Sequence, residues 1–127
     1  MTPGGGGPLV LLVDDEEHIL SALRRSLRRE GYQIVTAGSG AEALRILEER
    51  PVAAVVSDHK MPGMDGLALL ARVARRWPAA ARLMLTGWPG DLSRGELEGV
   101  GVAALLEKPW DDAELKSALR RALGDAV

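Results

Sequence analysis

The sequence has no cysteine among its 127 residues. This absence excludes disulfides and thiolate metal sites, and it favours a reducing, cytoplasmic location. No apolar run is long enough to span a bilayer, and the opening "MTPGGGGP" has neither the basic start nor the apolar centre of a secretory signal. A formal charge of −2 gives no general reason to expect nucleic acid or a membrane as a partner. We therefore expect the function to come from a local site.

The length suits one domain with a single core. The glycine-rich stretch at 1–8 offers no side chains to bury and is interpreted as a flexible leader. We predict one folded domain over residues 9–124, followed by a short tail at 125–127.

Short apolar runs recur along this domain, and they are apolar at both odd and even positions, as is typical of parallel strands covered on two faces. They are residues 9–13, 32–37, 52–57, 82–86 and 102–106. Segments with helical spacing lie between them. The clearest carries Ile19, Leu23 and Leu27 on one face. The weakest lies at 91–99, which is polar and rich in glycine.

Strands that alternate with helices predict an α/β fold, in which a doubly wound, five-stranded parallel sheet has helices on both faces. Such three-layer domains bind their ligands beyond the carboxyl ends of the strands. The residues at those ends are therefore the first candidates for a functional site.

Polar side chains stand at the ends of four of the five predicted strands. They are Asp14, Asp15, Asp58, Thr86 and Lys108. Three clustered carboxylates would raise one another's pKa unless a divalent cation lay among them, and oxygen ligands without histidine or cysteine point to Mg²⁺. With its charge offset by the metal, Asp58 could act as a nucleophile and form an aspartyl phosphate. Lys108 and Thr86 would then contact the phosphate oxygens.

Each of these residues also has an ordinary structural interpretation. The paired acids could cap the following helix, Thr86 could be a simple strand residue, and Lys108 could be a surface lysine. Their coincidence at one sheet edge favours a site. His18 and His59 have no partner at metal-ligand spacing, so they are interpreted as a helix-surface residue and as a loop residue beside the site.

Four motifs, in this order, resemble the receiver domain of two-component response regulators. They are "LLVDDEE", "VVSDHKMPGMDGLALL", "RLMLTG" and "LLEKPWD", and the resemblance runs from Leu9 to about Leu123. It implies a flavodoxin-like sheet with strand order 2-1-3-4-5. It also implies a phosphorylation-driven switch in signal transduction, and not an enzyme beyond the turnover of its own phosphate.

By position, the resemblance makes Asp58 the phosphoacceptor and places Mg²⁺ between Asp14, Asp15, Asp58 and the backbone carbonyl of Lys60. The same positions in the family make Lys60, two residues after the acceptor, a candidate to modulate the lifetime of the phosphate.

The resemblance makes Thr86 and Lys108 the pair that senses the phosphate, and it implies a cis peptide between Lys108 and Pro109. Trp88, two residues after the threonine, stands at a second position that modulates phosphate lifetime and could shield the phosphate from water. Leu105 departs from the family, because an aromatic switch residue is usual at this position and the chain contains no phenylalanine.

The partner implied by the resemblance is a sensor histidine kinase, whose phosphohistidine supplies the phosphoryl group. A downstream domain or protein would read the face formed by the fourth helix, fifth strand and last helix, and a homodimer through the last helix is a family expectation. "LTGW" and "EKPWDDAEL" are similar to receivers that precede HD-GYP-type phosphodiesterase domains or DNA-binding regulators. No direct contact with nucleic acid or membrane is expected of this domain.

Two alternatives stay open at this point. A phosphate-independent interaction module is favoured by Leu105 but disfavoured by the complete set of acids. A phosphatase with an aspartyl nucleophile would need a second acid two residues after Asp58, where the sequence has Lys60.

Overall fold

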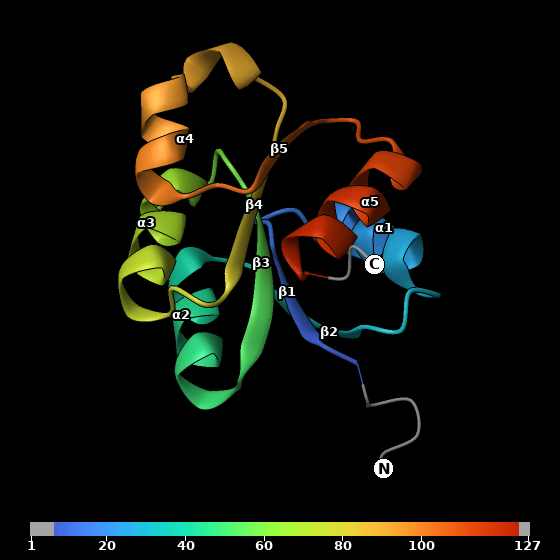
Figure 1. The fold of residues 1–127 in the computed structure, drawn as a ribbon. Coiled ribbons are helices and arrows are strands. Elements are labelled where there is room, and N and C mark those ends of the chain that lie inside the picture. The colour runs from blue at the N-terminus through green and yellow to red at the C-terminus, as the bar shows by residue number, and fades with distance from the viewer. Residues whose placement is uncertain (1–6, 125–127) are drawn as a thin grey trace.

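The structure of the chain is a computed structural model that describes residues 7–124. The predicted tail and residues 1–6 of the predicted leader lie outside the described residues. Strands and helices alternate along the chain (Figure 1). In order they are β1 (Leu9–Val13), α1 (Glu17–Leu27), β2 (Gln33–Ala37), α2 (Gly40–Glu49), β3 (Val52–Asp58), α3 (Gly66–Arg76), β4 (Ala81–Thr86), the 3-10 turn η1 (Pro89–Asp91), α4 (Arg94–Val100), β5 (Ala104–Glu107) and α5 (Asp112–Ala122).

The strands form one parallel sheet in the order β2-β1-β3-β4-β5. The predicted fold class and the strand order implied by the resemblance are therefore confirmed. Every residue of β1 is buried, because β1 has a strand on each side and helices over both faces. This double coverage explains why the strands are apolar at both odd and even positions.

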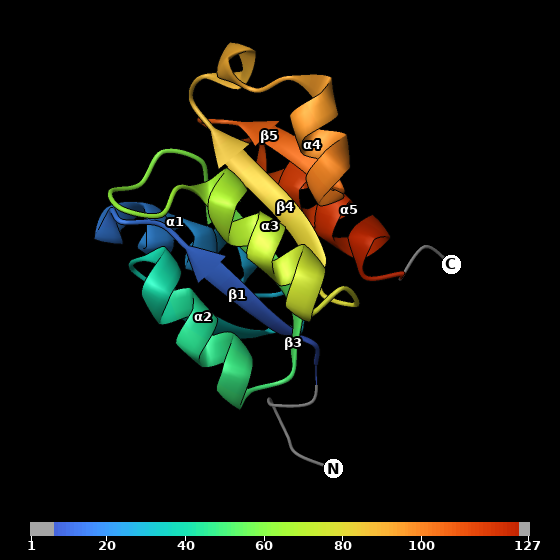
Figure 2. The ribbon, with the colours of Figure 1, turned by 90° about the vertical axis from the view of Figure 1, so that its left-hand side faces the viewer.

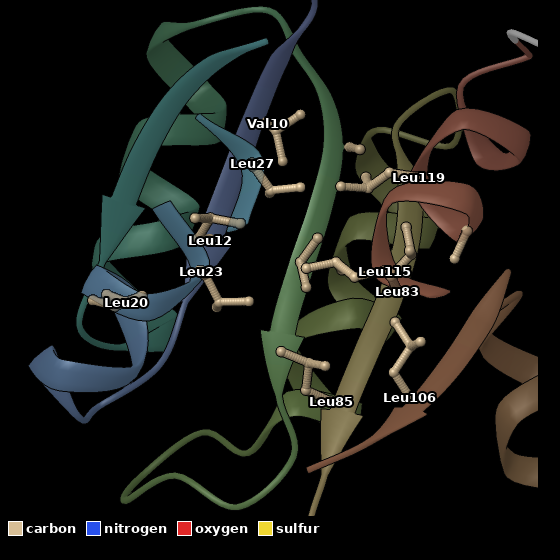
Figure 3. Packing of buried hydrophobic residues seen from close by; sticks show 13 residues of the cluster. Val10, Leu12, Leu20, Leu23, Leu27, Leu83, Leu85, Leu106, Leu115 and Leu119 are labelled. Carbon is tan, nitrogen blue, oxygen red and sulfur yellow. The ribbon is translucent and has the colours of Figure 1, made fainter. Parts of the chain in front are cut away.

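Helices α1 and α5 cover one face of the sheet, and α2, α3 and α4 cover the other (Figure 1). Alternate residues of β1 enter the two cores: Val10 and Leu12 pack toward α1 and α5, whereas Leu11 and Val13 pack toward the other three helices. Leucines of α1 and α5 belong to the first core and face it from its two sides (Figure 3). Each fully buried leucine contributes roughly 2 kcal/mol of burial free energy, so the two cores hold the sheet rigidly. Within the described residues, no helix is long and apolar enough to cross a membrane.

The segment with the weakest helical pattern does form a helix, α4. It begins with a capping box: the Ser93 hydroxyl accepts the backbone N–H of Glu96 at 3.0 Å, and the Glu96 carboxylate accepts the N–H of Ser93 at 2.9 Å. None of the seven residues of α4 is buried. Local capping therefore defines the start of this helix, where the hydrophobic pattern gives little signal.

The last strand begins later than predicted, at Ala104 and not at 102. The cause is the end of α4, where Gly101 adopts a left-handed conformation with φ 70°. The N–H of Val102 then donates to the carbonyl of Leu97 at 3.0 Å. The backbone of Val102 thus closes the helix and does not pair with the sheet.

The turn after β3 passes close to the strand it leaves. The N–H of Gly66, the first residue of α3, donates to the carbonyl of His59 at 2.7 Å. A Cβ atom on Gly66 would collide with the carbonyl oxygen of Asp58. Glycine at this position therefore allows the loop to return tightly and hold the backbone of Asp58.

Replacing Gly66 with alanine is expected to lower the free energy of unfolding by about 2 kcal/mol, because the new methyl group forces the Asp58 backbone aside. Urea denaturation at neutral pH measures this change. Gly99→Ala is the matched control: Gly99 also lies in a helix, and a Cβ there meets nothing within 4 Å. The control should be neutral or stabilising. Equal effects of the two substitutions would contradict the close-approach argument.

Candidate functional site

The carboxyl ends of β1, β3, β4 and β5 bring the predicted residues to one edge of the sheet. Figure 2 shows the arrowheads of β1 and β4 on the same side, next to the loop that follows β3. The sheet register fixes this arrangement. Asp58 pairs with Leu85 and Thr86 pairs with Glu107, while Asp14 comes directly after the last residue of β1. Each side chain therefore stands at a paired strand position or within two residues of one.

The three acids form a compact cluster. Asp14, Asp15 and Asp58 each offer a carboxylate oxygen, and these oxygens lie within 4.8 Å of one another. Asp14 is 1% exposed and Asp58 is 7% exposed, whereas Asp15 faces solvent. One oxygen of Asp14, Oδ1, accepts the N–H of Glu16 at 2.9 Å. Glu16 is the N-cap residue of α1, which has no side-chain capping hydrogen bond, so this contact turns the chain before the helix and does not cap it. The other oxygen of Asp14, Oδ2, is directed to Lys108.

Lys108 supplies the positive charge of the site. Its Nζ lies 3.0 Å from Oδ2 of Asp14 and 2.8 Å from Oδ1 of Asp58. The backbone N–H of Lys108 donates to the carbonyl of Thr86 at 2.8 Å, which ties the start of this turn to β4. The peptide between Lys108 and Pro109 is cis, as the resemblance implies.

The electrostatic balance of the site leaves a surplus of negative charge. Burial raises the pKa of Asp58 above its ordinary value, and the charge of Asp14 adds to this effect, although the hydrogen bond from Lys108 opposes it. Burial alone would lower the pKa of Lys108, but its hydrogen bonds to Asp58 and Asp14, with their charges, outweigh that cost and raise it. One ammonium thus contacts two carboxylates in a cluster of three acids.

The donor set fits a hard divalent cation. It consists of carboxylate oxygens alone, two of them on buried residues, and the single lysine does not fully offset their charge. Mg²⁺ prefers oxygen ligands and retains part of its water shell, which the exposed side of Asp15 permits. These residues could therefore hold the predicted metal.

Thr86 is fully buried at the end of β4, and its hydroxyl has two partners. Oγ1 accepts the backbone N–H of Trp88 at 2.9 Å and lies 3.2 Å from Nδ1 of His59. His59 does lie beside the site, as predicted, but it is only 7% exposed. The sequence pattern gave no sign of its contact with Thr86, because that contact joins the ends of two different strands.

Lys60 reaches the loop after β4 with its side chain. Its Nζ lies 2.8 Å from Oδ2 of Asp91, and it sits 5.8 Å from the centre of the Trp88 ring. Trp88 is 61% exposed. The hydrogen bond and charge of Lys60 lower the pKa of Asp91. The side chains of Lys60 and Trp88, both expected to affect phosphate lifetime, thus lie against each other at the rim of the site.

Leu105 occupies β5 opposite Met84 of β4 and is half-buried. It packs with the partly buried side chains of Leu97 and Val100 of α4 against the second core. A leucine here has no polar tip, so any signal at this position must come from apolar packing alone.

Replacing Lys108 with alanine should lower the free energy of unfolding of the metal-free protein by about 2 kcal/mol at pH 7, because two buried carboxylates lose their cation. The raised pKa of Lys108 means that its contribution is complete below the ordinary value of 10.5 and is lost only above it. The deficit should therefore stay constant from pH 7 to 9. The deficit should narrow before the pH reaches 3.8, the ordinary pKa of an aspartate, because the pKa of Asp58 is raised and its carboxylate becomes protonated above that value.

Urea denaturation in the presence of a chelator, at a series of pH values, measures this difference. Lys116→Ala in α5 is the matched control and should change the free energy of unfolding by less than about 0.5 kcal/mol. A deficit that stayed the same down to pH 4 would show that Lys108 stabilises the fold by packing and not by charge.

Comparison with known proteins finds similar regions in bacterial regulators. The chain is 39% identical over 118 residues to the transcriptional regulatory protein GlrR of Escherichia coli, with 93% of this chain and 26% of the relative covered. It is 35% identical over 116 residues to the hydrogenase transcriptional regulatory protein HoxA of Cupriavidus necator, with 90% and 24% covered. The chain thus spans about a quarter of the length of these curated relatives.

A solved structure supports the same assignment. The signal receiver domain of an HD domain-containing protein from Pseudomonas fluorescens Pf-5 superposes with a TM-score of 0.86 at 37% identity, with 94% of this chain and 96% of that chain covered. The sequence profile of the response regulator receiver domain matches residues 10–120. With the five-stranded sheet and the acid cluster at its edge, this match shows that the chain belongs to the receiver domain family of two-component response regulators.

Proposed function

We propose that Asp58 is the phosphoacceptor of this receiver domain and takes its phosphoryl group from a phosphohistidine on a sensor histidine kinase. The observation that carries the proposal is the position of Asp58: it ends a central strand, is nearly buried, and lies 2.8 Å from Lys108 within the acid cluster. We take residues 9–124 as the domain that performs this function. A kinase partner of this kind implies a location in the cytoplasm.

In the proposed reaction, a carboxylate oxygen of Asp58 attacks phosphorus and forms an O–P bond. The N–P bond of the phosphohistidine breaks, and its electron pair returns to the imidazole, which leaves with a proton from solvent. Lys108 stabilises the charge on the transferring oxygens, since it already lies against Asp58. Asp14, Asp15, Asp58 and the carbonyl of Lys60 would hold Mg²⁺, which when bound would supply further neutralisation of the phosphoryl charge.

The conformational readout is proposed to lie in Thr86, α4 and the surfaces beside them. Thr86 would donate its hydroxyl to the new phosphoryl group and draw the following loop toward Asp58. None of the residues of α4 is buried, so this helix can repack at low cost. The face formed by α4, β5 and α5 would then be read by an output domain or protein, or by a second copy of the chain.

The phosphate-independent module explains the observations less well. Burying Asp14 and Asp58 against one ammonium costs desolvation free energy. Phosphoryl transfer explains why the domain keeps this costly arrangement, whereas a phosphate-independent module does not. Leu105 lies on β5 opposite Met84 and is not a member of the acid cluster.

Incubation with acetyl phosphate and Mg²⁺ should add a single phosphoryl group to the wild-type chain, with acetate as the leaving group. Asp58→Asn should abolish the adduct, because an amide is not a nucleophile under these conditions. Intact mass spectrometry measures the adduct. Asp65→Asn is the matched control: Asp65 caps α3 on the same loop, and asparagine preserves a cap. An adduct of undiminished yield on Asp58→Asn would disprove the assignment.

Mg²⁺ should bind the unphosphorylated chain and change its tryptophan fluorescence, since Trp88 lies at the rim of the site. Asp15→Asn should weaken this binding about tenfold, because it removes one charged ligand. Glu16→Gln removes the same charge from the next residue, which is exposed and outside the cluster, and it should have little effect. Equal losses in both variants would indicate a general charge effect and not a ligand.

A further inference from the structure

His59 and Thr86 are brought together by the register of β3 and β4. Asp58 pairs with Leu85, and the ladder continues one step further because the N–H of His59 donates to the carbonyl of Leu85 at 3.0 Å. The next side chains along the two strands, His59 and Thr86, are both buried, with Nδ1 and Oγ1 separated by 3.2 Å.

The surrounding hydrogen bonds assign the direction of this contact. Oγ1 of Thr86 already accepts the N–H of Trp88 at 2.9 Å, so the hydroxyl proton needs an acceptor of its own. The Thr86 side chain is fully buried, and leaving that proton without a partner would be costly. Among the described residues, Nδ1 of His59 is the acceptor in reach. Thr86 therefore donates to His59, whose other ring nitrogen carries the proton.

We propose that His59 is a positioning residue that holds the hydroxyl of Thr86 in the unphosphorylated arrangement and so opposes the switch. This inference rests on the proposed function, in which the same hydroxyl must donate to the phosphoryl group on Asp58. A hydroxyl has one proton, so it cannot satisfy His59 and the phosphoryl group together. The hydrogen bond that Thr86 donates to His59 must therefore end before the hydroxyl can donate to a phosphoryl group.

The other contacts between the two loops are weaker candidates for this role. The ion pair of Lys60 with Asp91 is half-exposed on both sides, and exposed pairs of this kind contribute little. The stacking of Lys60 on Trp88 is likewise at the surface. The contact between His59 and Thr86 is the buried one among those the structure describes between these loops, and a buried hydrogen bond is worth more.

Beryllofluoride, which mimics a bound phosphoryl group, tests the proposal through its affinity for the full chain in saturating Mg²⁺. His59→Phe keeps a ring but removes the acceptor of the Thr86 hydroxyl. Binding then no longer requires the loss of this hydrogen bond, so the affinity for beryllofluoride should rise about fivefold. His59→Asn places an amide oxygen where Nδ1 stood, and it should restore the wild-type affinity. Isothermal titration measures both, with the Mg²⁺ affinity followed separately and expected to stay unchanged.

The effect must pass through the hydroxyl of Thr86. In a Thr86→Val background, His59→Phe should therefore change the affinity for beryllofluoride by less than about twofold. Unchanged or weaker binding by His59→Phe, or an equal effect in the Thr86→Val background, would overturn the proposal. Failure of the wild-type chain to bind beryllofluoride would instead contradict the proposed function itself, and the positioning role with it.

Discussion

The ammonium of Lys108, held between Asp14 and Asp58, is the interaction on which this edge of the sheet depends. Burial and the nearby charge of Asp14 raise the pKa of Asp58, and the hydrogen bond from Lys108 opposes that rise. One lysine for three acids also leaves negative charge to spare. That surplus would favour a divalent cation, and the cation and Lys108 together would keep the carboxylate of Asp58 ionised as a nucleophile. The same charge balance therefore supports both the stability of the edge and the proposed chemistry.

The parallel sheet makes this arrangement rigid. The residues of the site stand at strand ends whose register is fixed by backbone hydrogen bonds, and two separate cores clamp the sheet from either side. These side chains are already ordered before a ligand binds, so binding costs little conformational entropy. The close return of the loop at Gly66 adds a further restraint on Asp58.

The sheet and the charged residues of the site could be predicted because their signals are local. An apolar run that ends in an acid, as at Asp58, shows both the strand and the side chain it carries. The contact of His59 with Thr86 could not be predicted, because it depends on the register of β3 against β4. A shift of this register by one residue would abolish the contact. The late start of β5 was hidden for a similar reason: the backbone of Val102 is used by α4, a choice that apolar character does not reveal.

The proposed switch follows from the contrast between the rigid edge and the loose elements beside it. A phosphoryl group would bring a charge of about −1.5 to −2 to a cluster whose single lysine is already shared. A metal can offset part of that charge, but further hydrogen-bond donors must come from a neighbour that can move. Thr86 carries a suitable hydroxyl, and the segment after it leads through an exposed turn to a helix with no buried residue. In the proposed switch, the acids and Lys108 stay fixed and the donor comes from Thr86, so motion of the segment that follows would carry the signal to the α4 surface.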